Sequence, residues 1–487
     1  MRLRAGGSRP VRGVVLAVVV LVVLTTLGLG VWLSFHGAGA PSGSIFDQAP
    51  SGGVSPGTSQ PLTARNLAHL QPLWAHTFAP DAPSRMAVAN GMVYLTVTGA
   101  ARNFVAAIQN GRQVWRAQTA DPPQYIRAIQ VDGAAVVLVT DTAIYALNAN
   151  TGQALWQYRA AEPIHLGVAD GDLVYAAGLL YFSTDEQIYA LETSTGQLAW
   201  QYRAAARIHL GIADGDLVYA DGLLYYSTDE QVYALEVSTG QLAWSYRFSA
   251  DSQSAYSPIA PVLVVGAGRV YLSLSTSPYV VEAAVTALDG RTGMVRWQVR
   301  EEGASTITQP VLIVGDNGLL YRRVRDGVTA LDATTGHVSW HIAVSAAGSY
   351  DSASMAADQQ RLYLNVGGHI EAFDVSTGHL VWSSAALDGS RVMLGPMVSN
   401  GAIYVATATP VAPYGHALFT PIRAPHWMYA FDASSGSIVR MPQENDATYE
   451  PEFLAVDETH LYVLGSRSFI GADESAKGEP ELYALGV

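Results

Sequence analysis

The sequence contains no cysteine, and only 14% of its 487 residues are charged. Disulfides, thiolate metal sites and a lipid-modified N-terminal cysteine are therefore excluded. The G-x-S-x-G, P-loop and H-E-x-x-H patterns are also missing, which removes the most familiar signatures of hydrolases, nucleotide-binding proteins and zinc proteases. What the chain does contain is 49% hydrophobic residues and 46 glycines, a composition typical of many short strands joined by tight turns.

The charge balance is acidic, with a net charge of −14. Residues 1–40 hold arginines and no acidic residue, so the rest of the chain is more acidic than the whole. An acidic body repels phosphate backbones. We therefore expect no nucleic-acid partner.

An uncharged run, VVLAVVVLVVLTTLGLGVWLSF, covers residues 14–35. At a rise of about 1.5 Å per residue it is long enough to cross a hydrocarbon core about 30 Å thick. The basic tail at residues 1–13 favours a cytoplasmic N-terminus. The sequence therefore predicts a transmembrane signal-anchor helix at 14–35 and a single-pass protein of the cell membrane, with its body outside the cytoplasm.

Two other interpretations of this run remain open. Ala38-Gly39-Ala40 resembles the cleavage site of a secretory signal peptide, although the apolar core is long for one and Pro41 should hinder cleavage. A buried globular helix is the second alternative, but nothing amphipathic surrounds the run. Residues 36–61 follow as a Gly/Pro/Ser-rich flexible linker, because they hold too few apolar residues to fold.

The most informative stretch runs from Ile164 to Trp200 and recurs almost verbatim from Ile208 to Trp244. A segment that is copied whole without spoiling the protein is a self-contained structural unit. Its last part recurs along the chain, as ALNANTGQALW, ALETSTGQLAW, ALEVSTGQLAW, ALDGRTGMVRW, ALDATTGHVSW and AFDVSTGHLVW. Strand-like alternation, an Asp or Asn that caps a turn, and a glycine predict a β-hairpin. Two further strands around a DG or NG turn precede it, so each unit has four strands.

The pattern A-x-(D/N)-x-x-T-G-x-x-x-W resembles the tryptophan-docking motif of the PQQ-like repeat of quinoprotein-type β-propellers, and it recurs over residues 62–487. The resemblance implies an all-β fold, a single β-propeller of four-stranded blades. It also implies that each indole stacks against the turn of the neighbouring blade and donates its N–H to a carbonyl there, a structural role rather than a ligand-binding one. The residues expected in this role are Trp74, Trp115, Trp156, Trp200, Trp244, Trp297, Trp340 and Trp382.

Nine repeat units can be counted, one more than the eight blades common in the family. The surplus coincides with the near-identical copy, so we interpret the chain as an eight-bladed parent with one duplicated blade. A nine-bladed ring is favoured over an eight-bladed ring with one displaced unit. The chain ends on a strand that lacks its tryptophan partner, and the Trp74 strand lacks the preceding one. We therefore expect these two strands to pair and close the ring.

Length variation is concentrated in three repeats, and the last two of them are adjacent. Aromatic residues and arginine on long loops suit a protein-binding surface. The alternative is that these loops only plug the channel or cover a blade edge. The candidate partner-binding residues are Tyr414, His416, Phe419, Arg423, His426, Trp427, Glu444, Asp446, Glu450 and Phe469.

No metal site is expected. The Asp170-Gly171-Asp172 segment and its copy favour hairpin turns over a calcium loop, and His165 with its copy His209 reflects the duplication. The predicted function is a non-enzymatic protein-binding scaffold, similar to the propeller component of outer-membrane β-barrel assembly machinery, with an unknown extracytoplasmic protein partner. The alternatives are a pyrroloquinoline-quinone dehydrogenase and an extracytoplasmic sensor module. Such enzymes hold the quinone against a vicinal disulfide beside calcium, so no cofactor is expected in a cysteine-free chain.

Overall fold

The computed structural model describes residues 66, 71–78, 82–98, 103–118, 126–164, 173–206, 208, 217–228, 230–248, 262–274, 282–302, 311–315, 317–324, 327–344, 355–366, 368–387, 391–399, 401–408, 427–440, 447–456, 459–469 and 479–486. Within these ranges the regular elements are β-strands, which form nine four-stranded antiparallel sheets. No helix in this part of the chain is long and apolar enough to cross a membrane. The predicted tail 1–13, helix 14–35 and linker 36–61 lie outside the described residues.

The first four sheets, called blades 1 to 4, follow the chain in order. Blade 1 contains β2 (Ala82–Ala89), β3 (Met92–Thr98), β4 (Asn103–Gln109) and β5 (Arg112–Gln118); blade 2 contains β6 (Ala128–Asp132), β7 (Ala135–Val139), β8 (Ala143–Asn148) and β9 (Ala154–Arg159); blade 3 contains β10 (Val174–Ala176), β11 (Leu179–Ser183), β12 (Gln187–Glu192) and β13 (Leu198–Arg203); blade 4 contains β14 (Val218–Ala220), β15 (Leu223–Ser227), β16 (Gln231–Glu236) and β17 (Leu242–Arg247).

Blades 5 to 8 repeat this order. Blade 5 contains β18 (Val262–Gly266), β19 (Arg269–Leu274), β20 (Glu282–Asp289) and β21 (Val295–Glu302); blade 6 contains β22 (Val311–Val314), β23 (Leu319–Val324), β24 (Gly327–Asp332) and β25 (Val338–Ala343); blade 7 contains β26 (Met355–Ala357), β27 (Arg361–Val366), β28 (His369–Asp374) and β29 (Leu380–Ser383); blade 8 contains β30 (Arg391–Ser399), β31 (Ala402–Ala408), β32 (Trp427–Asp432) and β33 (Ile438–Arg440).

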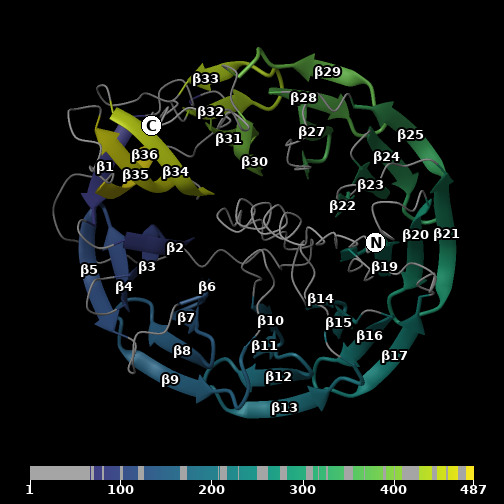
Figure 1. Cartoon of the computed structure of the whole chain (residues 1–487), viewed down its shortest axis with the longest axis horizontal. Helices are drawn as coiled ribbons and strands as arrows, with labels where there is room; N and C mark the ends of the chain where they lie inside the picture. Colours follow the sequence, from purple (N-terminus) through teal and green to yellow (C-terminus); the bar gives the residue numbers. More distant parts are fainter. Residues whose placement is uncertain are drawn as a thin grey trace, which may run out of the picture.

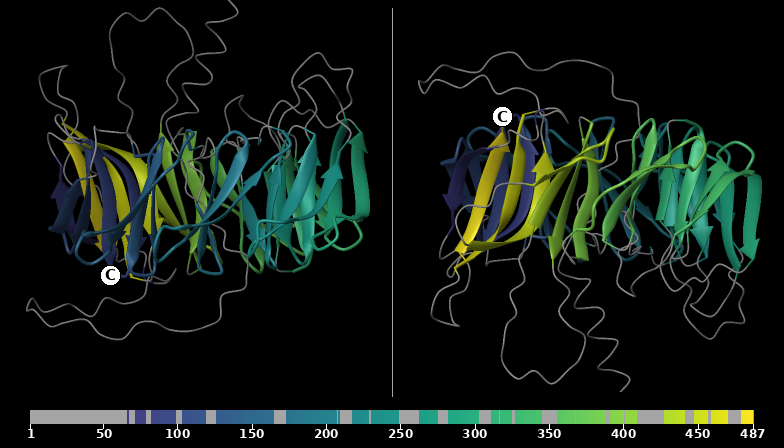
Figure 2. Two further views of the ribbon diagram at one scale, coloured as in Figure 1. Left: turned by 90° about the horizontal axis from the view of Figure 1, so that it is seen from below. Right: turned by 90° about the horizontal axis from the view of Figure 1, so that it is seen from above.

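Blade 9 is assembled from the two ends of the described chain. It contains β34 (Ala447–Val456), β35 (Leu461–Phe469) and β36 (Glu479–Gly486), and its outer strand is β1 (Gln71–Thr77). β1 pairs antiparallel with β36, from Gln71 opposite Gly486 to Thr77 opposite Glu481. The nine blades form a closed ring in which the first strand of each blade lies innermost and the fourth outermost (Figure 1). Seen from the side, the ring is a flat disc (Figure 2).

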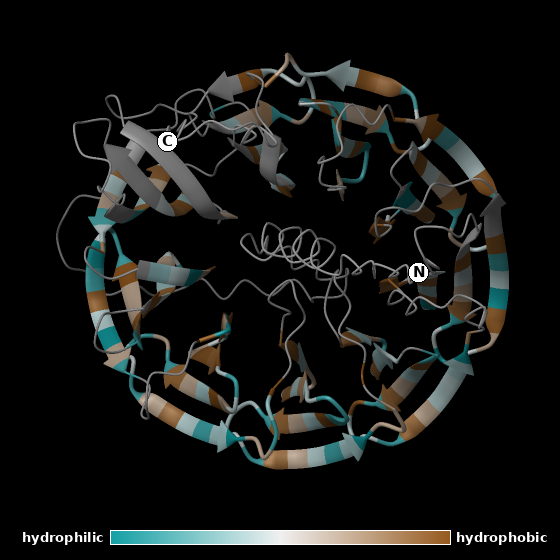
Figure 3. Ribbon diagram, in the orientation of Figure 1, coloured by the Kyte–Doolittle hydropathy of each residue, from teal (hydrophilic) through white to brown (hydrophobic). Residues whose placement is uncertain are grey.

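The hydrophobic residues place the core between the blades. The second and third strands of a blade are buried on both faces, as in β11 and β12, because each face packs against a neighbouring blade. Outer strands alternate between exposed and half-buried positions, so their hydropathy alternates along the rim (Figure 3). One core cluster joins Tyr94 and Val105 of blade 1 to Ile129 and Val136 of blade 2.

Blades 3 and 4, the near-identical copies, are two successive members of the ring. Their strands pair in the same register, with Tyr181 opposite Ala190 in blade 3 and Tyr225 opposite Ala234 in blade 4. Neither copy is displaced, so the predicted nine-bladed β-propeller is confirmed. Each blade packs mainly on its neighbours, which is why a ring accepts an added unit.

The turn between the third and outer strands is held by a side chain that mimics the backbone. In blade 6, Asp332 Oδ1 accepts the N–H groups of Thr334 at 2.9 Å and Thr335 at 2.7 Å, and the Thr335 hydroxyl at 2.9 Å. These hydrogen bonds, led by the one from the Thr335 hydroxyl, keep the pKa of Asp332 below its usual value. Blade 3 has Glu192 here, whose Oε2 accepts the Thr195 hydroxyl at 2.8 Å.

Shortening this glutamate in both copies should stabilise the ring. In Glu192→Asp combined with Glu236→Asp, each carboxylate reaches the turn N–H groups as Asp332 does. By analogy with side chains that cap helices, each change is expected to raise the free energy of unfolding by about 0.5–1 kcal/mol. Thermal unfolding followed by circular dichroism measures the gain, with Asp332→Glu as the reciprocal control that should lose stability. An unchanged melting temperature in the double variant would show that the capping geometry is not limiting.

Candidate functional site

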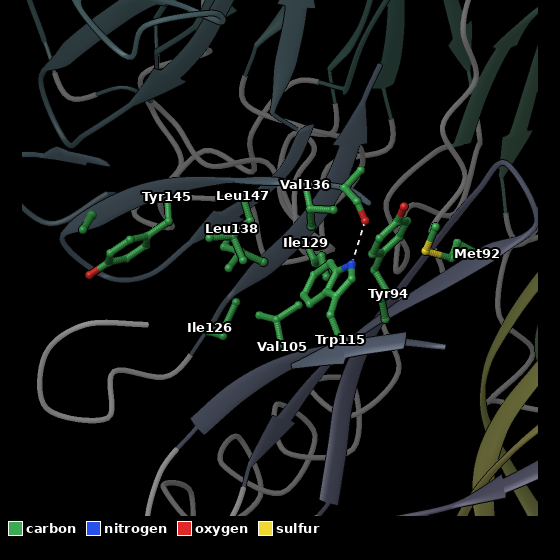
Figure 4. Packing of buried hydrophobic residues seen from close by; sticks show 13 residues of the cluster. Met92, Tyr94, Val105, Trp115, Ile126, Ile129, Val136, Leu138, Tyr145 and Leu147 are labelled. Carbon is green, nitrogen blue, oxygen red and sulfur yellow. Dashed lines mark hydrogen bonds between the residues drawn. The ribbon is translucent and has the colours of Figure 1, made fainter. Parts of the chain in front are cut away.

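The interfaces between blades are organised by tryptophan. Trp115 on the outer strand of blade 1 donates its indole N–H to the carbonyl of Ala149 in blade 2 at 2.8 Å (Figure 4). The same bond recurs at the next six interfaces, from Trp156 to Thr193, Trp200 to Val237, Trp244 to Gly290, Trp297 to Ala333, Trp340 to Val375, and Trp382 to Ala433. In each case the acceptor lies three residues after the alanine of the third strand. The indole therefore binds the same position of the neighbouring turn in every case.

The turn glycine provides the surface on which the indole lies. Gly240 of blade 4 has φ +69°, and a Cβ built on it would lie 2.5 Å from Cε3 of Trp200 in blade 3. The corresponding glycines of the other blades stand equally close to the preceding tryptophan, as Gly436 does to Trp382. Positive φ and contact with the indole thus make two separate demands for glycine at one position.

A second donor to the same carbonyl comes from a tyrosine on the second strand. Tyr225 of blade 4 donates its hydroxyl to Gly290 O at 3.1 Å, beside the indole of Trp244 at 2.8 Å. Tyr181, Tyr271, Tyr321 and Tyr363 donate in the same way to Val237, Ala333, Val375 and Ala433. We call this arrangement of one carbonyl and two donors the inter-blade clasp.

Sequence reasoning missed the tyrosine half of the clasp, although the signal was present. Eight of the nine repeats carry a tyrosine in the second strand, at residues 94, 181, 225, 271, 321, 363, 404 and 462, and Val137 takes the place in blade 2. In a strand a tyrosine reads as an ordinary core residue. Its hydroxyl becomes informative only when the neighbouring turn is placed.

The buried tyrosines make the ring sensitive to alkaline pH. Burial raises the pKa of Tyr94, Tyr181, Tyr225, Tyr321 and Tyr404 to about 12. An unfolded tyrosine has a pKa of about 10. Because the folded values are raised, this contribution to stability is complete below pH ~10 and is lost as the pH rises from ~10 to ~12.

We therefore expect tyrosinate absorbance and loss of the native circular dichroism signal to rise together within that pH range. Ionisation removes the hydroxyl proton that the clasp donates, so folding and ionisation are linked. Return to neutral pH is the control for reversibility. Complete ionisation below pH ~10 with a fully native signal would contradict the linkage.

Between blades 1 and 2 and between blades 2 and 3, the described residues supply only the indole donor of the clasp. Two further interfaces depart from the clasp more strongly. Where blade 9 meets blade 1, Trp74 packs on the shorter Asn110-Gly111 turn, with its Cβ 3.0 Å from the position of a Cβ on Gly111. His76 Nδ1 lies 3.1 Å from the carbonyl of Gly111 there. Where blade 8 meets blade 9, the tryptophan position holds Arg440, and the hydroxyl of Tyr404 is buried without a hydrogen-bond partner among the described residues.

The predicted partner-binding residues fall on blades 8 and 9 or outside the described chain. Trp427 begins β32 of blade 8, Glu450 lies in β34 and Phe469 ends β35, both in blade 9. The others lie outside the described residues: Tyr414, His416, Phe419, Arg423, His426, Glu444 and Asp446. The structure therefore places three of the ten on two neighbouring blades.

For these three residues the expectation of loops was wrong. Glu450 pairs with Ser466 and Phe469 with Ala447, in a hairpin that extends well beyond the strands of blade 3. Pro451 and Gly465 lie in the middle of it and read as strand breakers in the sequence. The structure places them opposite each other, and an irregularity between Pro451 and Phe453 absorbs the proline.

The described residues contain no group of three or more histidine, aspartate or glutamate side chains that could hold a metal ion. His165, His209 and the two Asp-Gly-Asp segments lie outside them. The tryptophans are committed to the blade interfaces. In the described part of the chain, their hydrogen bonds hold neighbouring blades together.

Comparison with known families adds to this geometry. The family described as outer membrane protein assembly factor BamB matches the chain in three overlapping segments, residues 63–210, 142–309 and 207–440, which together extend over most of its length. The chain belongs to the BamB family. A comparison with curated proteins gave no match.

Several solved structures are similar to this BamB-family chain at low identity. BamB from Moraxella catarrhalis is 16% identical, with 74% of this chain and 96% of that chain covered and a TM-score of 0.44. A europium-containing methanol dehydrogenase is 13% identical, covering 88% and 95%, with a TM-score of 0.48. Sqt1 from Saccharomyces cerevisiae is 12% identical, covering 76% and 99%, with a TM-score of 0.45. Similarity at this level carries no argument about function.

Blade 6 of this BamB-family propeller adds a polar link on each of its faces. Arg322 is 1% exposed, and its Nε donates to Ser273 Oγ of blade 5 at 3.2 Å. Arg323 donates from Nη2 to the carbonyl of Asn365 in blade 7 at 2.8 Å. Successive residues of a strand point to opposite faces of the blade, so the two arginines tie blade 6 to both neighbours. In blade 3, one of the two copied blades, these two positions hold Phe182 and Ser183.

Proposed function

We propose that this propeller is a non-enzymatic scaffold that binds another protein, and that its partner surface lies on blades 8 and 9. The observation that carries the proposal is the family match over residues 63–440, because that family is described as an assembly factor. The clasp supports it as well, since the repeated geometry of the interfaces uses the tryptophans and tyrosines to hold blades together. A partner would then bind to the parts of the repeats that differ from one blade to another.

Blades 8 and 9 differ most from the rest. Blade 8 has Arg440 in its outer strand in place of a tryptophan. Among the described strands, β34 and β35 of blade 9 are the longest first and second strands, and β30 of blade 8 is the next longest first strand. Of the candidate residues, Trp427 begins β32, Glu450 lies in β34 and Phe469 ends β35, and the other seven lie outside the described residues. Aromatic and arginine side chains gathered on one sector are typical of binding hot spots.

Crosslinking in the native membrane tests the partner surface. The intact protein is crosslinked and its partners are identified, and the experiment is repeated after deletion of residues 410–425. We expect the partner to disappear in the deletion variant. The matched control is Leu198→Ser with Leu242→Ser, which changes exposed residues on the rim of blades 3 and 4 and should leave the partner in place. Retention of the partner after the deletion, in a variant that still unfolds cooperatively, would refute the proposed sector.

We further propose that the helix at 14–35 anchors the propeller at the cell membrane, with the N-terminus in the cytoplasm. The absence of cysteine makes single labels unambiguous. Ser59→Cys should react with a membrane-impermeant maleimide on intact cells, whereas Ser8→Cys should react only after permeabilisation. Equal labelling of both in intact cells, or release of a processed protein into the medium, would refute the anchor.

The competing activity is a quinone-dependent dehydrogenase. It is tested by adding pyrroloquinoline quinone and calcium to residues 62–487 and following dye-linked oxidation of alcohols or sugars. The scaffold predicts no saturable binding and no turnover. Turnover would refute the scaffold proposal in favour of the dehydrogenase.

A further inference from the structure

We infer that the ring opens first at the seam between blades 8 and 9, which we call the 8/9 seam. Tyr404 faces this seam from blade 8. It is 1% exposed, and its hydroxyl has no hydrogen-bond partner in the part of the chain that the structure describes. The hydroxyl of Tyr363, the corresponding residue one blade earlier, has two acceptors within reach, Asp358 Oδ2 at 2.7 Å and the carbonyl of Ala433 at 3.4 Å. A buried hydroxyl without a partner is a net cost to the interface that holds it.

The donor side of the 8/9 seam also lacks its indole. Trp382 stands ten residues after the third-strand alanine of blade 7, and Arg440 occupies the same place after Ala430 in blade 8. An indole contributes a large flat apolar surface and one N–H, which together fill the space over the neighbouring turn. A guanidinium supplies no comparable apolar surface. Both donors of the clasp are therefore altered or unused at this one seam.

The acceptor side of the 8/9 seam also differs from the other interfaces. In blades 2 to 8 the acceptor carbonyl belongs to the turn that joins the third strand to the outer strand. In blade 9 these strands are β36 and β1, which come from distant parts of the chain, so no such turn connects them. The seam without a joining turn is thus the one that Tyr404 faces, next to the blade that has arginine at the tryptophan position.

The opposite side of blade 9 is well held, although its outer strand is joined to it only by hydrogen bonds. Trp74 packs on Gly111, and His76 lies 3.1 Å from the Gly111 carbonyl. A continuous core links the two blades, with Phe78, Tyr462, Leu464 and Leu482 packed against Val93, Leu95 and Phe104. Opening at the 8/9 seam therefore leaves blade 9 attached to blade 1, and the β1–β36 pair stays closed.

This inference does not depend on the proposed partner, yet it bears on it. The 8/9 seam separates the two blades that carry the proposed partner surface. A protein that contacts both blades would bridge the seam and hold the ring closed. Loss of binding and loss of seam opening are separate observations, so either idea can fail alone.

Distance measurements between introduced spin labels test the order of opening. The cysteine-free chain accepts three pairs at exposed positions: Ser437→Cys with Ala75→Cys spans the 8/9 seam, Ser383→Cys with Ser437→Cys spans blades 7 and 8, and Ala75→Cys with Gln113→Cys spans blades 9 and 1. At urea concentrations below the main unfolding transition, the first pair should show longer and broader distances while the other two stay unchanged. Simultaneous broadening of all three, or earlier broadening between blades 9 and 1, overturns the inference.

Three substitutions give an independent check. Tyr363→Phe removes a used donor and should lower the melting temperature, whereas Tyr404→Phe removes an unused one and should leave it unchanged or raise it. Arg440→Trp with Tyr404→Phe should shift the opening of the seam to higher urea. An equal loss of melting temperature in Tyr404→Phe and Tyr363→Phe would show that the Tyr404 hydroxyl is engaged, and the inference would fall.

Discussion

Gly240→Ala is expected to lower the free energy of unfolding by about 3 kcal/mol, because overpacking against an indole and a positive φ both add a cost. The new Cβ would lie 2.5 Å from Cε3 of Trp200 and 2.6 Å from its Cδ2, distances that real Cβ atoms do not adopt. The indole must move away from the turn, and its hydrogen bond to Val237 O at 2.8 Å is lost with the packing. Positive φ at this position, +69°, adds a further cost of about 1–2 kcal/mol.

Gly222 in the same blade is the matched control. It has φ +81°, but a Cβ there would meet nothing within 4 Å. Gly222→Ala therefore carries the backbone cost of about 1–2 kcal/mol alone. Urea unfolding of both variants, with a check that the m-value is unchanged, separates the two costs. Equal losses in the two variants would mean that the indole is not held by this turn.

Removal of residues 204–247 is expected to leave a folded ring of eight blades. The deletion joins Arg203 at the end of blade 3 to Phe248, and so removes one whole repeat of 44 residues. Blade 3 then faces blade 5 with the residues that blade 4 used: Tyr181 for Tyr225, Ser183 for Ser227 and Trp200 for Trp244. Because the new interface has the same side chains as the old one, its stability should be kept. Small-angle scattering should show a smaller ring, and thermal unfolding should remain cooperative.

Removal of blade 6 is the control for this deletion. Deleting residues 301–343 takes out a repeat in the same phase, but it also removes Arg322 and Arg323, whose bonds reach Ser273 and the carbonyl of Asn365. Blades 5 and 7 are then left facing each other with unmatched polar groups, and a markedly lower melting temperature is expected. If both deletion variants were equally stable, the identity of the copies would not matter. If neither folded, the ring would tolerate only nine blades.

The repeated part of the fold could be predicted from the sequence because a propeller interface is a local rule applied many times. The spacing from Trp156 to Trp200 and Trp244, together with the copied segment, predicted four-stranded blades and favoured nine of them, as the structure has. Each tryptophan and its turn glycine belong to a short motif that can be recognised in the sequence alone. The pairing of β1 with β36 could be expected for the same reason, since each lacks what the other supplies.

What could not be predicted depends on contacts between repeats or on exceptions to them. The clasp needs the hydroxyl of Tyr225 and the carbonyl of Gly290 at 3.1 Å, groups that are 65 residues apart in the chain. The strand positions of Glu450 and Phe469 depend on a hairpin that accepts Pro451 opposite Gly465. The candidate binding residues at 414–426 lie outside the described chain, so their part in function stays a prediction.

The indole bonds of the clasp have a direction, since in blades 1 to 7 each tryptophan donates to the next blade along the chain. Such a contact is head-to-tail, and it ends only when the circle closes on itself. Any fragment that stops short of closure keeps a free donor face at one end and a free acceptor face at the other. Broken or partly synthesised rings of this protein should therefore be self-adhesive and grow into chains of copies, and closure of the ring is what makes the protein a single molecule.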